Sequence, residues 1–125
     1  MKAVIAFLVA LLTGANGLLM LVDGAGWFGR VPGVPETGPY NPHFVQDIGV
    51  AFLVAGLALA AGAWRPRYWP AGLAGAAFLA GHALIHLVDI AFGHTHHAVF
   101  ELLAVVVPAA LALYSAVPAQ EAHHA

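Results

Sequence analysis

The sequence predicts an all-α integral membrane protein, folded as an antiparallel four-helix transmembrane bundle with a structured outer loop between helices 1 and 2. Three observations lead to this fold class. Of the 125 residues, 62% are apolar and 8% are charged, whereas soluble domains average about 45–50% and about 25%. The apolar residues form four stretches of about 20 residues, the length that a helix needs to cross a hydrocarbon core. Within each stretch they run continuously and do not alternate, which excludes the strand pattern of a β-barrel.

The composition also excludes several classes of protein. Four Lys/Arg and six Asp/Glu residues are too few to cover a soluble domain, so an ordinary cytosolic enzyme, a nucleic-acid-binding protein and a disordered chain are ruled out. The absence of cysteine rules out disulfides, thiolate metal sites, iron–sulfur clusters and covalently attached c-type haem. We therefore expect one transmembrane domain over residues 1–125, with the lipid bilayer as its main partner.

Helix boundaries follow from the apolar stretches and from the prolines. The four expected helices occupy about residues 4–22, 44–64, 68–92 and 98–117. The first is expected to be a retained signal anchor, because its apolar core is long for a cleaved signal peptide. Pro66 and Pro70 mark the tight turn between the second and third helices. Pro108 is expected to kink the fourth helix.

The basic residues predict the orientation in the membrane. Lys2, Arg65 and Arg67 lie on one side of the expected bundle, and only Arg30 lies on the other. The positive-inside rule then predicts a multi-pass protein of the cell inner (plasma) membrane, with both termini, including the tail 118–125, in the cytoplasm.

The outer loop, residues 23–43, is rich in glycine and proline and carries no helical pattern. Its prolines and aromatic residues predict a semi-rigid cap on the outer membrane surface. Glu36, in the middle of this loop, is expected to be solvated.

Ionisable residues recur on three of the expected helices at spacings of three or four, which place them on one face of each helix. These residues are His43 and Asp47 on the second helix, His82, His86 and Asp89 on the third, and His97 and Glu101 on the fourth. Counting about 1.5 Å per residue from the outer helix ends, all seven lie in the outer leaflet, with His82 near the middle of the membrane. Ionisable residues inside membrane helices are costly and are functional candidates.

These seven residues predict a transition-metal site in the outer leaflet, because histidines and carboxylates on facing helices form metal sites in bundles. Without thiolates, the donors favour zinc, iron, copper(II) or manganese. We expect His86 and Asp47 at the centre, since they lie on different helices at matching depth, and Asn16 as their hydrogen-bonding partner from the first helix. The sequence names no catalytic residue and no reaction; metal handling, electron transfer and an oxidation all remain open.

Three other interpretations stay open. The polar groups would instead hydrogen-bond across helices, as in an Asp47–His86 pair, and the chain would be a non-catalytic accessory subunit of a larger membrane complex or a homo-oligomer. Glu101 would then pair with His97. Haem b would need His43 or His97 as an axial ligand opposite His86. Buried carboxylate–imidazole chains also carry protons, so a proton or quinone relay is the last interpretation.

Two segments carry a resemblance to other membrane proteins. They are Asn41-Pro42-His43-Phe44-Val45-Gln46-Asp47-Ile48-Gly49 and His82-Ala83-Leu84-Ile85-His86-Leu87-Val88-Asp89. Together they resemble a group of small uncharacterised bacterial four-helix membrane proteins, broadly similar to the DoxX-like membrane proteins in size and helix number. The resemblance implies a four-helix fold in a prokaryotic inner membrane and no catalytic residues.

Overall fold

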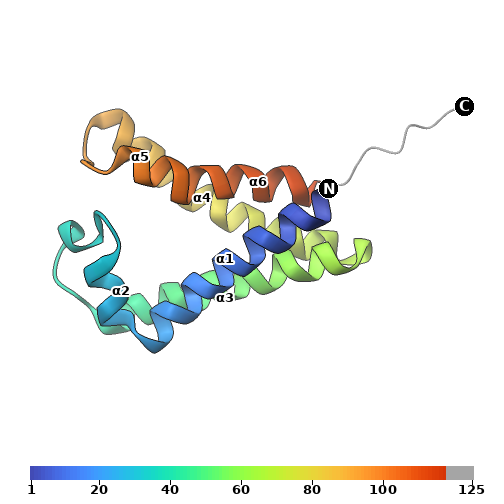
Figure 1. Ribbon diagram of the computed structural model, residues 1–125, viewed down its shortest axis with the longest axis horizontal. Helices are drawn as coiled ribbons and strands as arrows, with labels where there is room; N and C mark the ends of the chain where they lie inside the picture. Colours follow the sequence, from blue (N-terminus) through green and yellow to red (C-terminus); the bar gives the residue numbers. More distant parts are fainter. Residues whose placement is uncertain (118–125) are drawn as a thin grey trace, which may run out of the picture.

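The computed structural model describes residues 1–117, which form helices and, within that range, no strand. Four helical segments are long and apolar enough to cross a membrane. They are α1 (Lys2–Val22), α3 (Pro42–Trp64), α4 (Trp69–Phe92) with the short η2 (Pro66–Tyr68) before it, and the segment Ala98–Ala116. In Figure 1, α1 lies beside α3, and α4 lies beside α6, the last part of that final segment. The tail 118–125 lies outside the described residues.

Local capping explains where the long helices begin and end. The side chain of Asn41 accepts a hydrogen bond from the backbone N–H of Phe44 at 3.1 Å, and Pro42 occupies the first turn of α3, where a proline fits without loss of a hydrogen bond. At the same end of the molecule, α4 stops at Gly93. The φ of 70° at Gly93 is the left-handed conformation that glycine adopts at helix C-termini. These caps fix the point at which each helix leaves the polar end of the molecule.

The final segment is not a uniform α-helix. It consists of α5 (Ala98–Glu101), the π-helical turn η3 (Leu102–Val106) and α6 (Val107–Ala116). Pro108 lacks an N–H and its ring would collide with a carbonyl of the preceding turn in a regular helix. The sequence predicted a kink at this proline, and the irregularity found is the wider π-helical turn before it. This turn begins directly after Glu101, and such turns are frequent at functional sites.

The segment 23–43 differs from the prediction of a loop without helical pattern, because it contains α2 (Gly24–Arg30) and the 3₁₀ turn η1 (Val34–Thr37). Asp23 explains α2. Its carboxylate accepts a hydrogen bond from the N–H of Gly26 at 3.1 Å and forms an ion pair with Arg30 at 2.7 Å. The glycines of α2 have low helix propensity and concealed it in the sequence.

Small residues set how closely the helices pack. A Cβ atom added to Gly56 of α3 would lie 2.7 Å from the backbone nitrogen of Gly14 in α1, and one added to Gly75 of α4 would lie 2.6 Å from the carbonyl oxygen of Ala55 in α3. Backbones that approach this closely are typical of helix contacts in membranes, where small residues replace a hydrophobic driving force.

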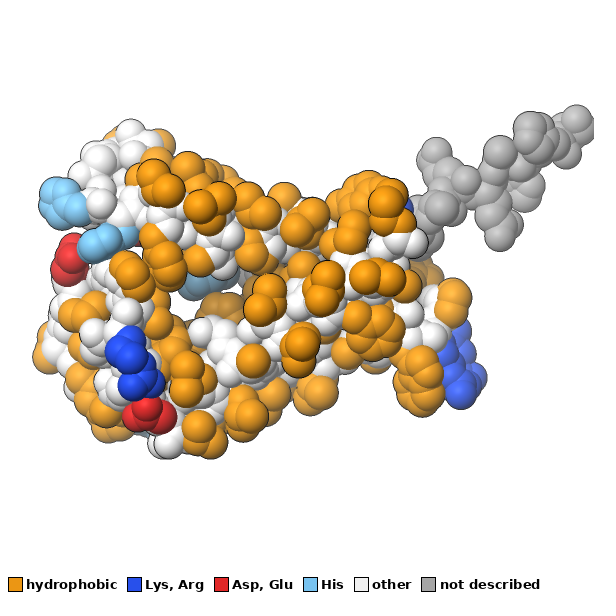
Figure 2. All heavy atoms as spheres, in the orientation of Figure 1, with side chains coloured by type: hydrophobic (Ala, Val, Ile, Leu, Met, Phe, Trp, Pro, Cys, Tyr) orange, Lys and Arg blue, Asp and Glu red, His pale blue; other side chains and the backbone are white. Residues whose placement is uncertain are grey.

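Apolar side chains cover the outside of the helices, and charged side chains lie at the two ends (Figure 2). Leu11, Leu57 and Leu103, on three different helical segments, are 69%, 63% and 65% exposed. Soluble monomers rarely expose apolar surface on this scale.

Candidate functional site

The candidate site centres on Glu101, the only charged residue that is buried among residues 1–117, with 6% of its surface exposed. Its Oε1 atom accepts a hydrogen bond from the hydroxyl of Thr95 in the loop before α5. Its Oε2 atom lies 3.1 Å from Nδ1 of His86 in α4. The imidazole is not aligned for a hydrogen bond at that distance, so Oε2 has no hydrogen-bond partner within the described chain. The Glu101 carboxylate is therefore buried, and one of its two oxygens accepts no hydrogen bond.

Two histidines on α4 continue from Glu101 toward the interior. The rings of His86 and His82 are one helical turn apart and meet edge to face, with 4.8 Å between their centroids. The His82 ring is also edge-on to Phe52 of α3 at 5.2 Å and parallel to Phe78 at 6.5 Å. Aromatic packing thus fixes His82 at the inner end of this line of polar groups.

A second contact lies on the outer side of Glu101. The Nε2 atom of His97 lies 2.8 Å from the carboxylate of Glu36 in η1, and the backbone N–H of His97 donates to the hydroxyl of Thr95 at 3.0 Å. A Cβ atom on Gly33 would lie 3.3 Å from the His97 ring and 3.8 Å from Oε1 of Glu101. The backbone at Gly33 therefore lies beside both the His97 ring and the Glu101 carboxylate.

We call these side chains the polar chain: Glu36, His97, Thr95, Glu101, His86 and His82. It runs from an exposed carboxylate to the middle of α4. Figure 2 shows histidine and acidic side chains side by side at the end of the molecule away from the N-terminus, and a hollow with a histidine side chain at its wall.

The expected centre, His86 with Asp47, is wrong. Asp47 lies instead 3.5 Å from His43 on its own helix, and both side chains are largely exposed. The buried positions of α3 near its start are Val45, Gly49 and Phe52, so Asp47 faces outward. Asp47 was expected at the same depth in the membrane as His86, but it lies on a face of α3 that points away from His86.

Two further pairings also differ from expectation. Asn16, expected at the site, accepts a hydrogen bond from the indole N–H of Trp27 at 2.9 Å and holds α2 against α1. Glu101 does not pair with the His97 side chain, because Thr95 occupies its Oε1 atom. Asp89 lies 3.6 Å from His94, near the surface.

The seven predicted metal ligands consequently lie in separate groups. Within residues 1–117, no three His, Asp or Glu side chains converge in a way that could hold a metal ion. The residues considered as haem b ligands opposite His86 also have other neighbours. His43 lies on the outside of α3, and His97 is engaged with Glu36.

Sequence reasoning missed Thr95, Glu36 and Gly33. Thr95 stands between histidines in the run His94-Thr95-His96-His97, where no spacing marks its hydroxyl as a partner of Glu101. Glu36 was expected to be solvated, and its partner His97 is 61 positions away, so no local pattern signals the contact.

Comparisons of the chain with models of known protein families, with characterised proteins and with solved structures give no match. The resemblance to DoxX-like membrane proteins therefore remains a prediction from two segments.

Proposed function

We propose that this protein is an antiparallel four-helix transmembrane bundle of a bacterial inner membrane that transfers protons between its outer surface and the middle of the membrane. Four apolar helical segments of sufficient length support the membrane placement. The positive-inside rule supports cytoplasmic termini, because Lys2, Arg65 and Arg67 lie at the end of the bundle where α1 begins.

The observation that carries the proton proposal is the buried Glu101 carboxylate with its open Oε2 atom beside His86. A polar group buried without a hydrogen-bond partner is costly, and ionisable residues at membrane depth mark ion pathways and proton relays. A small rotation of the His86 ring would align Nδ1 with Oε2. The proton would then lie between the two groups, held by the carboxyl in one state and by the imidazole in the other.

The transfer would proceed in single proton steps. A proton enters at the exposed Glu36–His97 pair and would reach Glu101 through a water molecule, since the His97 ring and the Glu101 carboxylate both lie beside Gly33. Glu101 passes it to Nδ1 of His86, which releases its Nε2 proton toward His82. The ring is left protonated at Nδ1, and it is reset for the next proton when it turns over or when the steps run in reverse. Each step deprotonates one group and protonates the next, and the reverse order returns the proton.

The polar chain ends at His82. Among residues 1–117, no histidine or carboxylate lies closer to the Lys2 end of the bundle than His82. The proton would therefore be exchanged there with a molecule in the lipid phase, and a quinone is the class of lipid-soluble carrier that gains and loses protons at that depth.

Infrared spectroscopy of the protein in lipid bilayers at different pH values tests this proposal. The absorption of protonated carboxyl groups should grow as the pH falls, and the difference between wild type and Glu101→Gln isolates the contribution of Glu101. The matched control is Asp47→Asn, since Asp47 is exposed, and it should retain the contribution of Glu101. A spectrum that is identical in wild type and Glu101→Gln over the whole pH range would reject proton transfer through Glu101.

Metal binding is the second candidate function, and it depends on the same two atoms, Nδ1 of His86 and Oε2 of Glu101. Two ligands bound to one ion at about 2.0–2.2 Å lie roughly 3 Å apart, as Nδ1 of His86 and Oε2 of Glu101 do. His82, water or both would have to complete the coordination. Elemental analysis of untagged protein, before and after addition of zinc, iron, copper or manganese, distinguishes the candidates: a metal site requires about one ion per chain that is lost in His86→Ala and retained in His43→Ala.

A further inference from the structure

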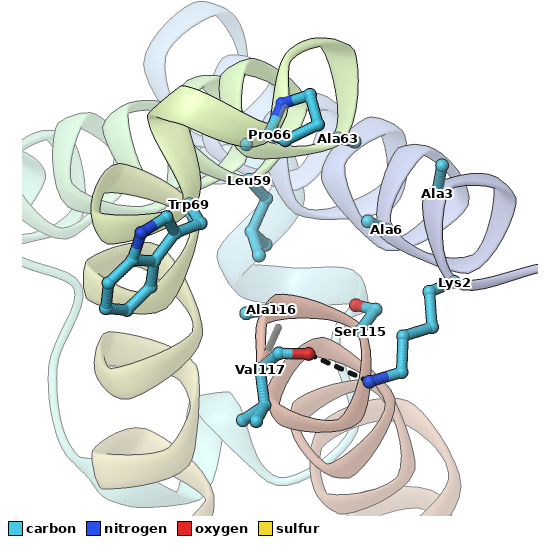
Figure 3. A pocket seen from close by; sticks show the side chains of 12 residues that line it. Lys2, Ala3, Ala6, Leu59, Ala63, Pro66, Trp69, Ser115, Ala116 and Val117 are labelled. Atoms are coloured by element: carbon cyan, nitrogen blue, oxygen red, sulfur yellow. Dashed lines mark hydrogen bonds between the residues drawn. The ribbon is translucent and has the colours of Figure 1, made fainter. Parts of the chain in front are cut away.

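A cavity of about 430 Å³ lies at the opposite end of the bundle from the polar chain (Figure 3). It opens where the start of α1, the turn between α3 and α4, and the end of α6 meet. Gly62 and Gly72 bring α3 and α4 so close that a Cβ on Gly62 would lie 3.0 Å from the Gly72 backbone. The walls of the cavity are mainly apolar and include Leu59, Ala63 and Trp69.

The rim of the cavity is cationic. Figure 3 shows Lys2 reaching across the opening, where its Nζ donates a hydrogen bond to the backbone oxygen of Val117 at 2.8 Å. Arg65 and Arg67, in the adjacent turn, lie over the rings of Trp64 and Tyr68. Every carboxylate side chain of residues 1–117 belongs to the other end of the molecule, so none of them neutralises Lys2.

We propose that this cavity binds one anionic phospholipid, with the phosphate at Lys2 and part of an acyl chain against the apolar wall. An amphiphile joins an anionic group directly to hydrocarbon, as the cavity joins a cationic rim directly to an apolar interior. Basic pockets between helices at the cytoplasmic face recognise anionic headgroups in this way. Free phosphate would leave the apolar wall of the cavity uncovered, whereas the acyl chain of a lipid would cover it. Lipid binding at this cavity rests on membrane insertion but not on proton transfer.

Trp69 provides the measurement, because it lines the cavity. The protein is reconstituted in vesicles of phosphatidylcholine with a minor share of phosphatidylglycerol. In one sample the phosphatidylglycerol carries bromine on its acyl chains, and in the other an equal amount of the phosphatidylcholine does. The bromine quenches the fluorescence of a tryptophan that it contacts. The difference in quenching between wild type and Trp69→Phe isolates Trp69 from Trp27 and Trp64. Brominated phosphatidylglycerol should quench Trp69 more strongly than brominated phosphatidylcholine at equal mole fraction.

Charge variants test where the headgroup is held. Lys2→Gln should lower the preference for phosphatidylglycerol about fivefold, the contribution of one basic residue near a membrane surface, and Lys2→Arg should retain it. Arg30→Gln removes one positive charge at the other end and should leave the preference unchanged. Ala63→Phe should fill the cavity and abolish the preference with Lys2 intact, and added inorganic phosphate should not compete.

Three outcomes would overturn the proposal. Equal quenching by the two lipids in wild type would show that Trp69 faces ordinary bilayer. A preference that survives Lys2→Gln and Ala63→Phe would place the headgroup outside the cavity, and competition by inorganic phosphate would make the site an anion site without lipid. Failure of membrane insertion would be distinct, because neither brominated lipid would then quench any tryptophan.

Discussion

The Oε2 atom of Glu101 lies 3.1 Å from Nδ1 of His86 and has no hydrogen-bond partner within residues 1–117. This contact connects the start of the last membrane-length segment to the middle of α4, at a residue that is 94% buried. Packing alone does not require a carboxylate there, because apolar side chains of similar volume often replace buried charges without loss of stability. The position therefore favours a role in chemistry over a role in folding.

Glu101→Gln should separate these two roles. The glutamine oxygen can still accept the Thr95 hydrogen bond, and the substitution removes a charge whose burial is costly, so we expect the free energy of unfolding to change by less than about 1 kcal/mol. The contribution of Glu101 to the pH-dependent carboxyl signal should disappear. Unfolding in a detergent titration, followed by circular dichroism, measures the first effect. A loss of several kcal/mol would instead make Glu101 a structural residue and the chain an accessory or structural subunit.

Gly56→Ala and Gly14→Ala form a matched pair at the contact between α1 and α3. The added Cβ of Gly56→Ala would meet Gly14 and Ala10 backbone atoms at 2.7–2.9 Å, whereas that of Gly14→Ala meets nothing within 4 Å. We expect Gly56→Ala to destabilise the fold by about 1–3 kcal/mol. Gly14→Ala should stabilise it by about 0.5–1 kcal/mol, because alanine favours a helix over glycine. Equal effects of the two substitutions would contradict the close α1–α3 packing.

The Trp27–Asn16 hydrogen bond should hold α2 against α1. Asn16→Ala leaves the indole N–H without its 2.9 Å partner and should cost about 1 kcal/mol, as typical hydrogen bonds do. In a Trp27→Phe background the same substitution should cost nothing further, since the bond is already absent. This double-mutant cycle measures the coupling, and additive effects would place α2 elsewhere.

Asp23 should make α2 sensitive to acid. The hydrogen bond from Arg30, followed by that from the Gly26 N–H, holds the pKa of Asp23 below its ordinary value. Because the pKa is lowered on folding, the carboxylate stabilises α2 fully above the ordinary value of about 3.9, and this stabilisation is lost as the pH falls through the lowered pKa. Hydrogen exchange of the Gly26 amide should therefore differ between wild type and Asp23→Asn near neutral pH and converge in acid. An identical rate in both proteins near neutral pH would exclude the cap.

The membrane-length helices could be predicted because length and apolar composition alone decide them. α2 could not, since its glycines oppose a helix and its stability comes from Asp23, Arg30 and the contact of Trp27 with Asn16. These contacts depend on the chain folding back, which propensity does not describe.

The candidate site could be predicted only in part. Spacing placed His82 and His86 on one face of α4, and these two remain together. Spacing could not reveal which helix faces that side. The predicted partner of His86 is Asp47, whereas the residue found beside His86 is Glu101, which is also one of the seven predicted residues. The buried face of α3 consists of small and apolar residues such as Gly49 and Phe52, and Asp47 lies off this face.

Nitrogen NMR of selectively labelled histidine, recorded in lipid as a function of pH, tests proton sharing between His86 and Glu101 most directly. If the two groups share a proton, they titrate as a coupled pair, and Glu101→Gln moves the titration midpoint of His86 while that of the exposed His43 stays in place. If the His86 signals titrate identically in wild type and Glu101→Gln, the two side chains are neighbours without exchange, and the proposed proton transfer is wrong.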